Sequence, residues 1–152
     1  MKGLPAGIRL RSATDRDAGR IRSLILRVRI NPTQLDWSRF VVAVDPDERL
    51  IGCGQVKPHG DGSRELASIA VRPAWRLRRV ASAIVADLQR LHSPPLWLTC
   101  RPWLAAFYER FGFQIVEEPD AMPRYFQKIV RLARLGDWLG SGERLAVMQW
   151  KG

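Results

Sequence analysis

Residues 64–91 read RELASIAVRPAWRLRRVASAIVADLQRL, and this stretch decides the fold. Residues 66–71 form an almost unbroken apolar run, which is typical of a strand covered on both faces. Pro73 ends the strand, because proline has no amide hydrogen to give to the ladder. Helical spacing follows, with apolar residues on one face at Val80, Ala83, Ile84 and Leu88. The stretch therefore predicts a strand, a turn and a long helix.

Four arginines lie between the predicted strand and the body of the helix: Arg72, Arg76, Arg78 and Arg79. A helix start presents free backbone N–H groups and the positive end of the helix dipole. Guanidinium groups placed there strengthen binding of an anion. A solvated basic turn is the alternative, but four clustered arginines favour a phosphate-binding site.

Length and composition predict one domain spanning residues 1–152. No segment approaches the roughly 20 apolar residues that span a bilayer, so we expect no membrane partner. The N-terminus lacks the apolar core of a signal peptide, and we expect a cytoplasmic protein. Cys53 and Cys100 lie in apolar runs without metal-ligand spacing, which predicts buried free thiols and no metal site.

The formal net charge of +10, from 25 basic and 15 acidic side chains, favours anionic partners. These include nucleic acid, a membrane surface and a phosphorylated small molecule. Residues 122–135 predict a basic amphipathic helix, which fits either a surface-binding helix or one packed on a sheet. No recognised nucleic-acid motif is present, so nucleic acid is the weaker alternative.

The remaining elements follow from apolar runs and turn residues. We expect strands at residues 8–11, 40–44, 50–56, 96–100, 113–116 and 145–150, and helices at 14–30, 103–111 and 122–135. The short turn at residues 45–48 predicts an antiparallel hairpin, whereas Gly136, Gly140 and Gly142 predict a loop. This order predicts an α/β fold with a mixed sheet of six or seven strands and helices on both faces.

Three features together resemble the GNAT superfamily of acetyl-CoA-dependent N-acetyltransferases: the hairpin, the strand–turn–helix and the segment AAFYERFGF at residues 105–113. The family turn has the form Q/R-x-x-G-x-G/A, where Arg76 matches the first position and Ala81 the last. Arg79 stands where the family usually has glycine, which lets the backbone approach a pyrophosphate. We expect Arg79 to keep ordinary helical angles and pair with a phosphate, although it can equally crowd the cofactor.

The resemblance implies a mostly antiparallel sheet and a co-substrate, acetyl-CoA, in a cleft between the central and fifth strands. Its pantetheine would pair with the backbone of Ile69, Ala70 and Val71. Its pyrophosphate would meet seven residues of the turn: Arg76, Leu77, Arg78, Arg79, Val80, Ala81 and Ser82. The implied partners are acetyl-CoA and an amine acceptor, bound by a monomer or homodimer.

The resemblance also implies that Tyr108 protonates the leaving thiolate. A phenol with a pKa near 10 suits this role, because its proton affinity is not far from that of a thiolate. The alternative is an ordinary aromatic residue in a helix packed on the sheet. The family often has asparagine where this chain has Arg101.

Glu65 matches the glutamate that many family members use to deprotonate the amine, a role that requires partial burial to raise its pKa. The alternative is an exposed carboxylate paired with Arg64 or Lys57. His59 is a second candidate base, although its turn KPHGDGS predicts an exposed loop histidine, and a water chain is the third.

The acceptor amine is left open among small molecules, free amino acids and proteins. Its predicted lining residues are Leu35, Trp37, Gln55, Met122 and Tyr125. Two alternatives to an acetyltransferase remain at this point: a CoA-binding module without turnover, suggested by Arg79, and a basic nucleic-acid-binding protein.

Overall fold

A computed structural model describes residues 3–138 and 144–152, which fall into two compact units. The first unit contains residues 1–57 and 66–92, and the second contains residues 58–65 and 93–152. Strand β4, Arg64–Val71, contributes to both. Its first two residues belong to the second unit and the rest to the first.

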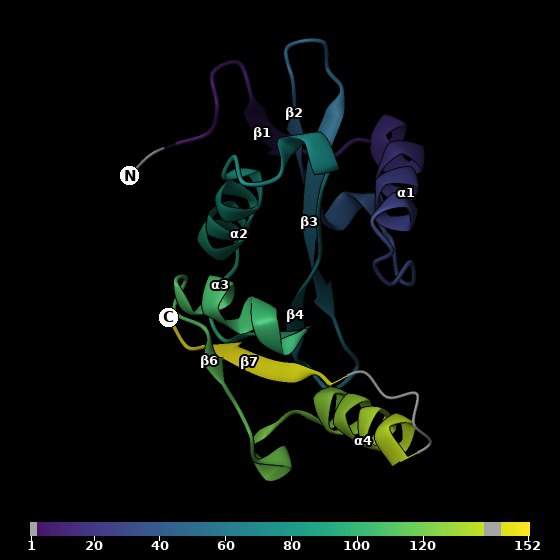
Figure 1. Cartoon of the computed structure of the whole chain (residues 1–152), viewed down its shortest axis with the longest axis vertical. Coiled ribbons are helices and arrows are strands. Elements are labelled where there is room, and N and C mark those ends of the chain that lie inside the picture. The colour runs from purple at the N-terminus through teal and green to yellow at the C-terminus, as the bar shows by residue number, and fades with distance from the viewer. Residues whose placement is uncertain (1–2, 139–143) are drawn as a thin grey trace. The chain divides into compact units, whose positions relative to one another are not determined.

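The first unit is a sheet with a helix on each face (Figure 1). Its strands follow the order β1 (Arg9–Ser12), β2 (Phe40–Val44), β3 (Leu50–Pro58) and β4. Helices α1 (Ala18–Arg27) and α2 (Val80–Leu91) cover the opposite faces. Strands β2 and β3 pair antiparallel, which confirms the predicted hairpin.

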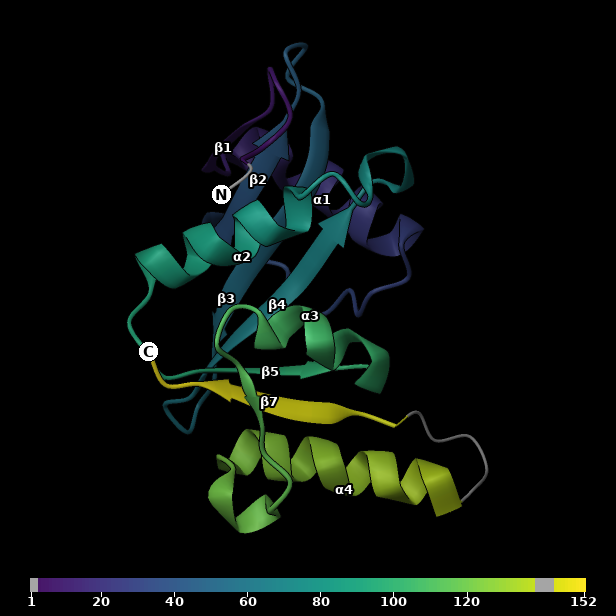
Figure 2. The ribbon, with the colours of Figure 1, turned by 60° about the vertical axis from the view of Figure 1, so that its left-hand side comes forward.

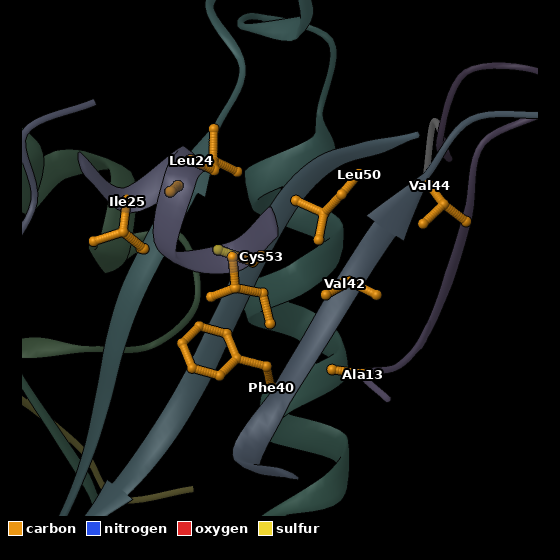
Figure 3. Close-up of a cluster of buried hydrophobic side chains, with 10 residues drawn as sticks. Ala13, Leu24, Ile25, Phe40, Val42, Val44, Leu50 and Cys53 are labelled. Atoms are coloured by element: carbon orange, nitrogen blue, oxygen red, sulfur yellow. The ribbon is translucent and has the colours of Figure 1, made fainter. Parts of the chain in front are cut away.

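A buried apolar cluster joins α1 to the sheet of the first unit. Leu24 and Ile25 project from α1 towards Phe40 and Val42 of β2 and Cys53 of β3 (Figure 3). Phe40 is 2 % exposed, and Ile25, Val42 and Cys53 are fully buried. Apolar side chains three and four residues apart share a helix face, which is why α1 presents one continuous stripe to the strands.

Two glycines of β3 allow α2 to pack directly on the other face. A Cβ at Gly54 would lie 2.6 Å from a side-chain carbon of Ile84, and a Cβ at Gly52 would lie 2.8 Å from Val80. These distances are too short for a real contact, so larger residues would push α2 away from the sheet. The glycines thus fix the height of the α2 N-terminus above β3.

Asp17 anchors the start of α1. Its side chain is 1 % exposed and accepts hydrogen bonds from both terminal nitrogens of Arg11, at 2.6 and 3.1 Å, and from the amide of Thr14 at 2.8 Å. The pKa of Asp17 is held below its ordinary value, first by the Arg11 hydrogen bonds. A buried carboxylate with these partners is stable in its charged form.

The second unit is a smaller sheet that also carries a helix on each face (Figure 2). Its strand order is the start of β4, then β5 (Leu96–Cys100), β7 (Ala146–Trp150) and β6 (Gln114–Ile115). Glu65 of β4 pairs in parallel with Trp97 of β5, whereas β7 pairs antiparallel with both neighbours. Helices α3 (Ala105–Glu109) and α4 (Arg124–Trp138) lie on opposite faces of β5 and β7.

The described residues therefore form an α/β fold with seven mostly antiparallel strands and four helices, as the sequence predicts. In the described ranges, no helix is long and apolar enough to cross a membrane. Cys53 and Cys100 are buried and free, which confirms the prediction of buried free thiols.

Several element boundaries differ from the predicted ones. Helix α1 begins at Ala18 after a 3-10 turn and ends at Arg27, because Arg29 adopts a left-handed φ of 60°. Helix α4 runs to Trp138 and includes Gly136, which was expected in a loop; one glycine in a helix costs only about 1 kcal/mol. The predicted loop positions Gly140 and Gly142 lie outside the described residues.

The burial of strand β4 also differs from the prediction. The apolar run predicted a strand covered on both faces, but buried and half-buried residues alternate from Leu66 to Val71.

Candidate active site

The turn between β4 and α2 has a defined backbone in the first unit. The amide of Arg72 donates to the carbonyl of Ile51 at 2.8 Å, and a 3-10 turn follows at Pro73–Trp75. Leu77 and Arg79 then adopt left-handed angles, with φ of 62° and 67°. Arg79 is the N-cap of α2, and its side chain makes no capping hydrogen bond. Arg79 therefore gives the first turn of α2 no side-chain cap. Backbone N–H groups at a helix start can bind an anion.

The expectation that Arg79 keeps helical angles is wrong. Its φ of 67° and ψ of 15° lie in the left-handed region, which glycine enters without steric cost. The chain must change direction between the turn and α2, and this residue makes the change. The structure therefore gives a conformational reason for glycine at this position of the signature.

The four arginines of the turn lie in different surroundings. The guanidinium of Arg78 lies over the ring of Trp75, with 5.3 Å from Cζ to the ring centroid. Arg72 lines a cavity with residues of α1. Arg76 and Arg79 have exposed side chains and lie just before the start of α2. The predicted basic cluster is thus divided between different surroundings.

The other residues predicted to bind the cofactor range from buried to fully exposed. Ala70 and Val80 are buried, and Leu77 is fully exposed. Four residues are half-buried: Ile69, Val71, Ala81 and Ser82.

Gln55 of β3 is fully buried and its side-chain amide is fixed in the first unit. Nε2 donates to Ser68 Oγ at 2.8 Å and to the backbone carbonyl of Gln34 at 3.3 Å. A carbonyl can only accept, so the NH₂ group must face Gln34. Oε1 is then a buried acceptor without a hydrogen-bond partner in the described part of the chain, and it can receive an N–H group.

Ser68 interrupts β4 beside this amide. Its φ of 59° is unusual for a residue inside a strand, and its carbonyl accepts from Cys53 Sγ at 3.6 Å. Non-glycine residues in left-handed conformations gather at functional sites, where the surrounding structure holds them. No pattern in the sequence predicts the left-handed conformation of Ser68.

The other predicted acceptor-lining residues divide between the units. In the first unit, Leu35 and Trp37 line a cavity of about 110 Å³ together with Ile21 and Arg22 of α1. In the second unit, Met122 packs with Trp97 and Phe126 in the core and also lines a cavity of about 420 Å³. Tyr125 is the remaining member and contacts His59.

His59 and Glu65 form a buried pair in the second unit. His59 Nε2 lies 2.8 Å from Glu65 Oε1, and their side chains are 4 % and 9 % exposed. Tyr125 stacks on the imidazole, with ring centroids 3.5 Å apart. The expectation of an exposed loop histidine is therefore wrong, and Glu65 is buried rather than an exposed strand-end carboxylate.

The cover over this pair comes from α4, which lies far from it in the sequence. The backbone amide of Tyr125 donates to Asp61 Oδ2 at 3.0 Å, which ties the 58–63 turn to the start of the helix. The pKa of Asp61 is lowered to about 2, first by the Ser63 hydroxyl and then by this amide. Sequence reasoning missed this cover, because nothing local in KPHGDGS indicates it.

Tyr108 of α3 is buried with an edge-on contact to Phe113. Burial raises the pKa of Tyr108 far above its ordinary value, and the nearby Cys100 raises it further. The phenol is thus neutral across the physiological range and a weaker acid than expected from a pKa near 10. Arg101, in place of the family asparagine, lies over the ring of Trp103.

The two thiols are unsuited to nucleophilic chemistry. Burial raises the pKa of Cys53 to about 12 and that of Cys100 to about 11. The thiolate, rather than the thiol, is the nucleophile, so neither cysteine is a candidate acyl carrier. Within the described ranges, no group of His, Cys, Asp and Glu could hold a metal ion.

A family model described as an acetyltransferase (GNAT) domain matches residues 36–115, which is more than half of the chain. The chain belongs to the GNAT family. The matched range contains every catalytic and cofactor residue predicted from the sequence, from Glu65 through the turn to Tyr108. A comparison with curated proteins finds no match.

Several solved structures share this fold at low sequence identity. The N-acetylglutamate synthase of Neisseria gonorrhoeae, complexed with coenzyme A and N-acetyl-glutamate, aligns with a TM-score of 0.72 and 18 % identity. The alignment covers 97 % of this chain but only 35 % of the synthase. Rv2747 from Mycobacterium tuberculosis, in complex with CoA and NLQ, has a TM-score of 0.72 and 20 % identity over 95 % of this chain and 99 % of that chain. Ard1 from Thermoplasma volcanium has a TM-score of 0.68 and 15 % identity over 96 % and 98 %.

Proposed function

We propose that this GNAT protein is a single N-acetyltransferase domain that moves an acetyl group from acetyl-CoA to a primary amine by direct attack. The observation that carries the proposal is the turn into α2. Its left-handed residues, Leu77 and Arg79, precede a helix start that Arg79 does not cap. Family membership and the CoA complexes of two similar structures support the same assignment.

Acetyl-CoA would supply the activated thioester, and the chain would supply its binding groups. In the proposal, the backbone of Ile69, Ala70 and Val71 pairs with the pantetheine. Residues 76–82 hold the pyrophosphate, through the amides at the start of α2 and the side chains of Arg76 and Arg79. Free helix amides and guanidinium groups are the donors that phosphate oxygens accept.

The pair of His59 and Glu65 is the proposed route for the proton of the attacking amine. An ionised Glu65 carboxylate can only accept, so the His59 nitrogen that faces it carries the hydrogen. In the proposal, the other imidazole nitrogen, Nδ1, takes the proton from the amine, and Glu65 stabilises the resulting imidazolium. His59 and Glu65, the two candidate bases, would thus act together to deprotonate the amine.

Tyr108 is proposed to stabilise the departing thiolate. Because its pKa is raised well above that of a thiol, full proton transfer from the phenol is unfavourable. A hydrogen bond donated from the hydroxyl to the sulfur needs no such transfer. Tyr108 would thus act mainly as a hydrogen-bond donor in the transition state.

Calorimetric titration with acetyl-CoA tests the assignment of the turn. Arg76→Ala should weaken binding about tenfold or more, since a hydrogen bond to a charged group contributes about 1.5–3 kcal/mol. Arg16→Ala is the matched control, because it removes the same charge from an exposed position outside the turn. Equal affinity of the Arg76 variant and the wild type would place the cofactor elsewhere. Tight binding without transfer to any amine of a broad panel would instead indicate a CoA-binding module without turnover.

A further inference from the structure

Helix α1 and the residue that follows β4 line an open pocket of about 220 Å³ in the first unit. It lies apart from the residues proposed to hold the pyrophosphate, none of which lines it. Its lining, named here the arginine pocket, consists of Gly19, Arg20, Ser23, Leu24, Arg27 and Arg72.

Three arginines from two rigid elements line the arginine pocket. Arg20 and Arg27 are seven residues apart on α1, so they lie on one helix face on either side of Leu24. Leu24 is 4 % exposed and gives the pocket an apolar floor. Arg72 is fixed from the other side, because its backbone amide donates to Ile51 of β3.

No carboxylate compensates these charges in the described part of the chain. Two acidic side chains near the start of α1 and in the β2–β3 turn pair with other arginines: Asp17 with Arg11, and Glu48 with Arg9 and Arg11. Arg20 reaches only a backbone carbonyl, that of Glu48, at 3.4 Å. Three like charges around one hollow repel one another, and an anion between them removes that repulsion.

We propose that the arginine pocket binds a phosphate group. Guanidinium groups bind phosphate through paired hydrogen bonds, and the Ser23 hydroxyl adds a neutral donor. The volume of about 220 Å³ is below the 300–1,000 Å³ typical of pockets for whole drug-sized ligands, so a single phosphate group fits better than a nucleotide. The phosphate can come from the ribose phosphate of CoA or from a separate phosphorylated ligand.

Two binding measurements on the full chain separate these sources. The first compares the affinities of CoA and dephospho-CoA, which differ only in the ribose phosphate. The second measures the binding of inorganic phosphate by calorimetry at low ionic strength. Both are made on the wild type, on Arg27→Ala and on Arg20→Ala, with Arg16→Ala as a control of equal charge.

The pocket variants should weaken phosphate binding about tenfold, because each removes a charge-assisted contact, while the control changes it little. If CoA supplies the phosphate, the preference for CoA over dephospho-CoA should also fall about tenfold in the pocket variants. If that preference is unchanged and only inorganic phosphate binding falls, the ligand is a separate phosphorylated molecule. Unchanged values for both measurements overturn the proposal.

The phosphate arm is independent of the proposed acetyl transfer. A chain that binds neither CoA nor dephospho-CoA but loses phosphate binding in the pocket variants would refute the cofactor assignment and retain the pocket.

Discussion

Replacing Arg79 by glycine should stabilise the protein, although the change removes a whole side chain. The left-handed conformation costs an L-residue about 1–2 kcal/mol, which glycine does not incur. Glycine also has more conformational freedom in the unfolded chain, and this lowers the free energy of unfolding by about 0.5–1 kcal/mol. The midpoints of the two ranges differ by about 0.75 kcal/mol in favour of Arg79→Gly.

Thermal unfolding with two companion variants isolates the backbone contribution. For a chain of this length, about 1 kcal/mol shifts the midpoint by about 2–4 °C, so Arg79→Gly should raise it by about 1–4 °C. Arg79→Ala keeps the β-carbon and should stay close to the wild type. Ala86→Gly, at an exposed position inside α2, should lower stability by about 1 kcal/mol.

The direction of the midpoint shift for Arg79→Gly tests whether residue 79 is left-handed. If Arg79→Gly lowers the midpoint as much as Ala86→Gly does, residue 79 is not left-handed and the account of the turn is wrong.

The same variants show what the Arg79 side chain does for acetyl-CoA. We expect both Arg79→Gly and Arg79→Ala to bind acetyl-CoA about tenfold more weakly, since each loses a charged phosphate contact. Tighter binding by the glycine variant would show that the side chain crowds the cofactor.

Three further predictions address the chemistry and the fold. Tyr108→Phe should lower turnover by about 10²-fold while acetyl-CoA affinity changes little, and unchanged turnover would remove the phenol from the mechanism. Glu65→Gln should lower the transfer rate at neutral pH by about 10²-fold or more without loss of acetyl-CoA binding, and an unchanged rate would exclude the pair with His59 as the proton route. Asp17→Asn should lower the free energy of unfolding by about 2 kcal/mol at neutral pH. Because the folded pKa of Asp17 is lowered, this difference from the wild type is present above about pH 4 and should disappear as the pH falls through the folded pKa; urea unfolding at several pH values measures it.

Local patterns determined most of the elements. Residues 40–44 and 50–58 form the predicted hairpin, because apolar runs joined by a short turn have few other ways to pair. The α2 stripe of Val80, Ile84 and Leu88 is buried as expected, because helical spacing alone places these residues on one face. The match of AAFYERFGF and the arginine turn to the GNAT pattern is likewise a property of neighbouring residues.

The side-chain environments depended on tertiary structure. His59 looked like an exposed turn residue, but α4 covers it through Tyr125 although more than 60 residues separate them. Burial also raised the pKa of Tyr108 and so changed its proposed role from proton donor to hydrogen-bond donor. Such effects arise from residues distant in the sequence, which no local pattern contains.

The arginine turn shows the division most clearly. The sequence by itself determined that four guanidinium groups lie between a strand and a helix, because composition and propensity are local. The folded chain shows in addition that Arg72 lies beside α1, that Arg78 lies on Trp75 and that Arg79 takes a left-handed angle. The backbone path into α2 and the packing of α1 direct each side chain, and both depend on contacts across the sheet.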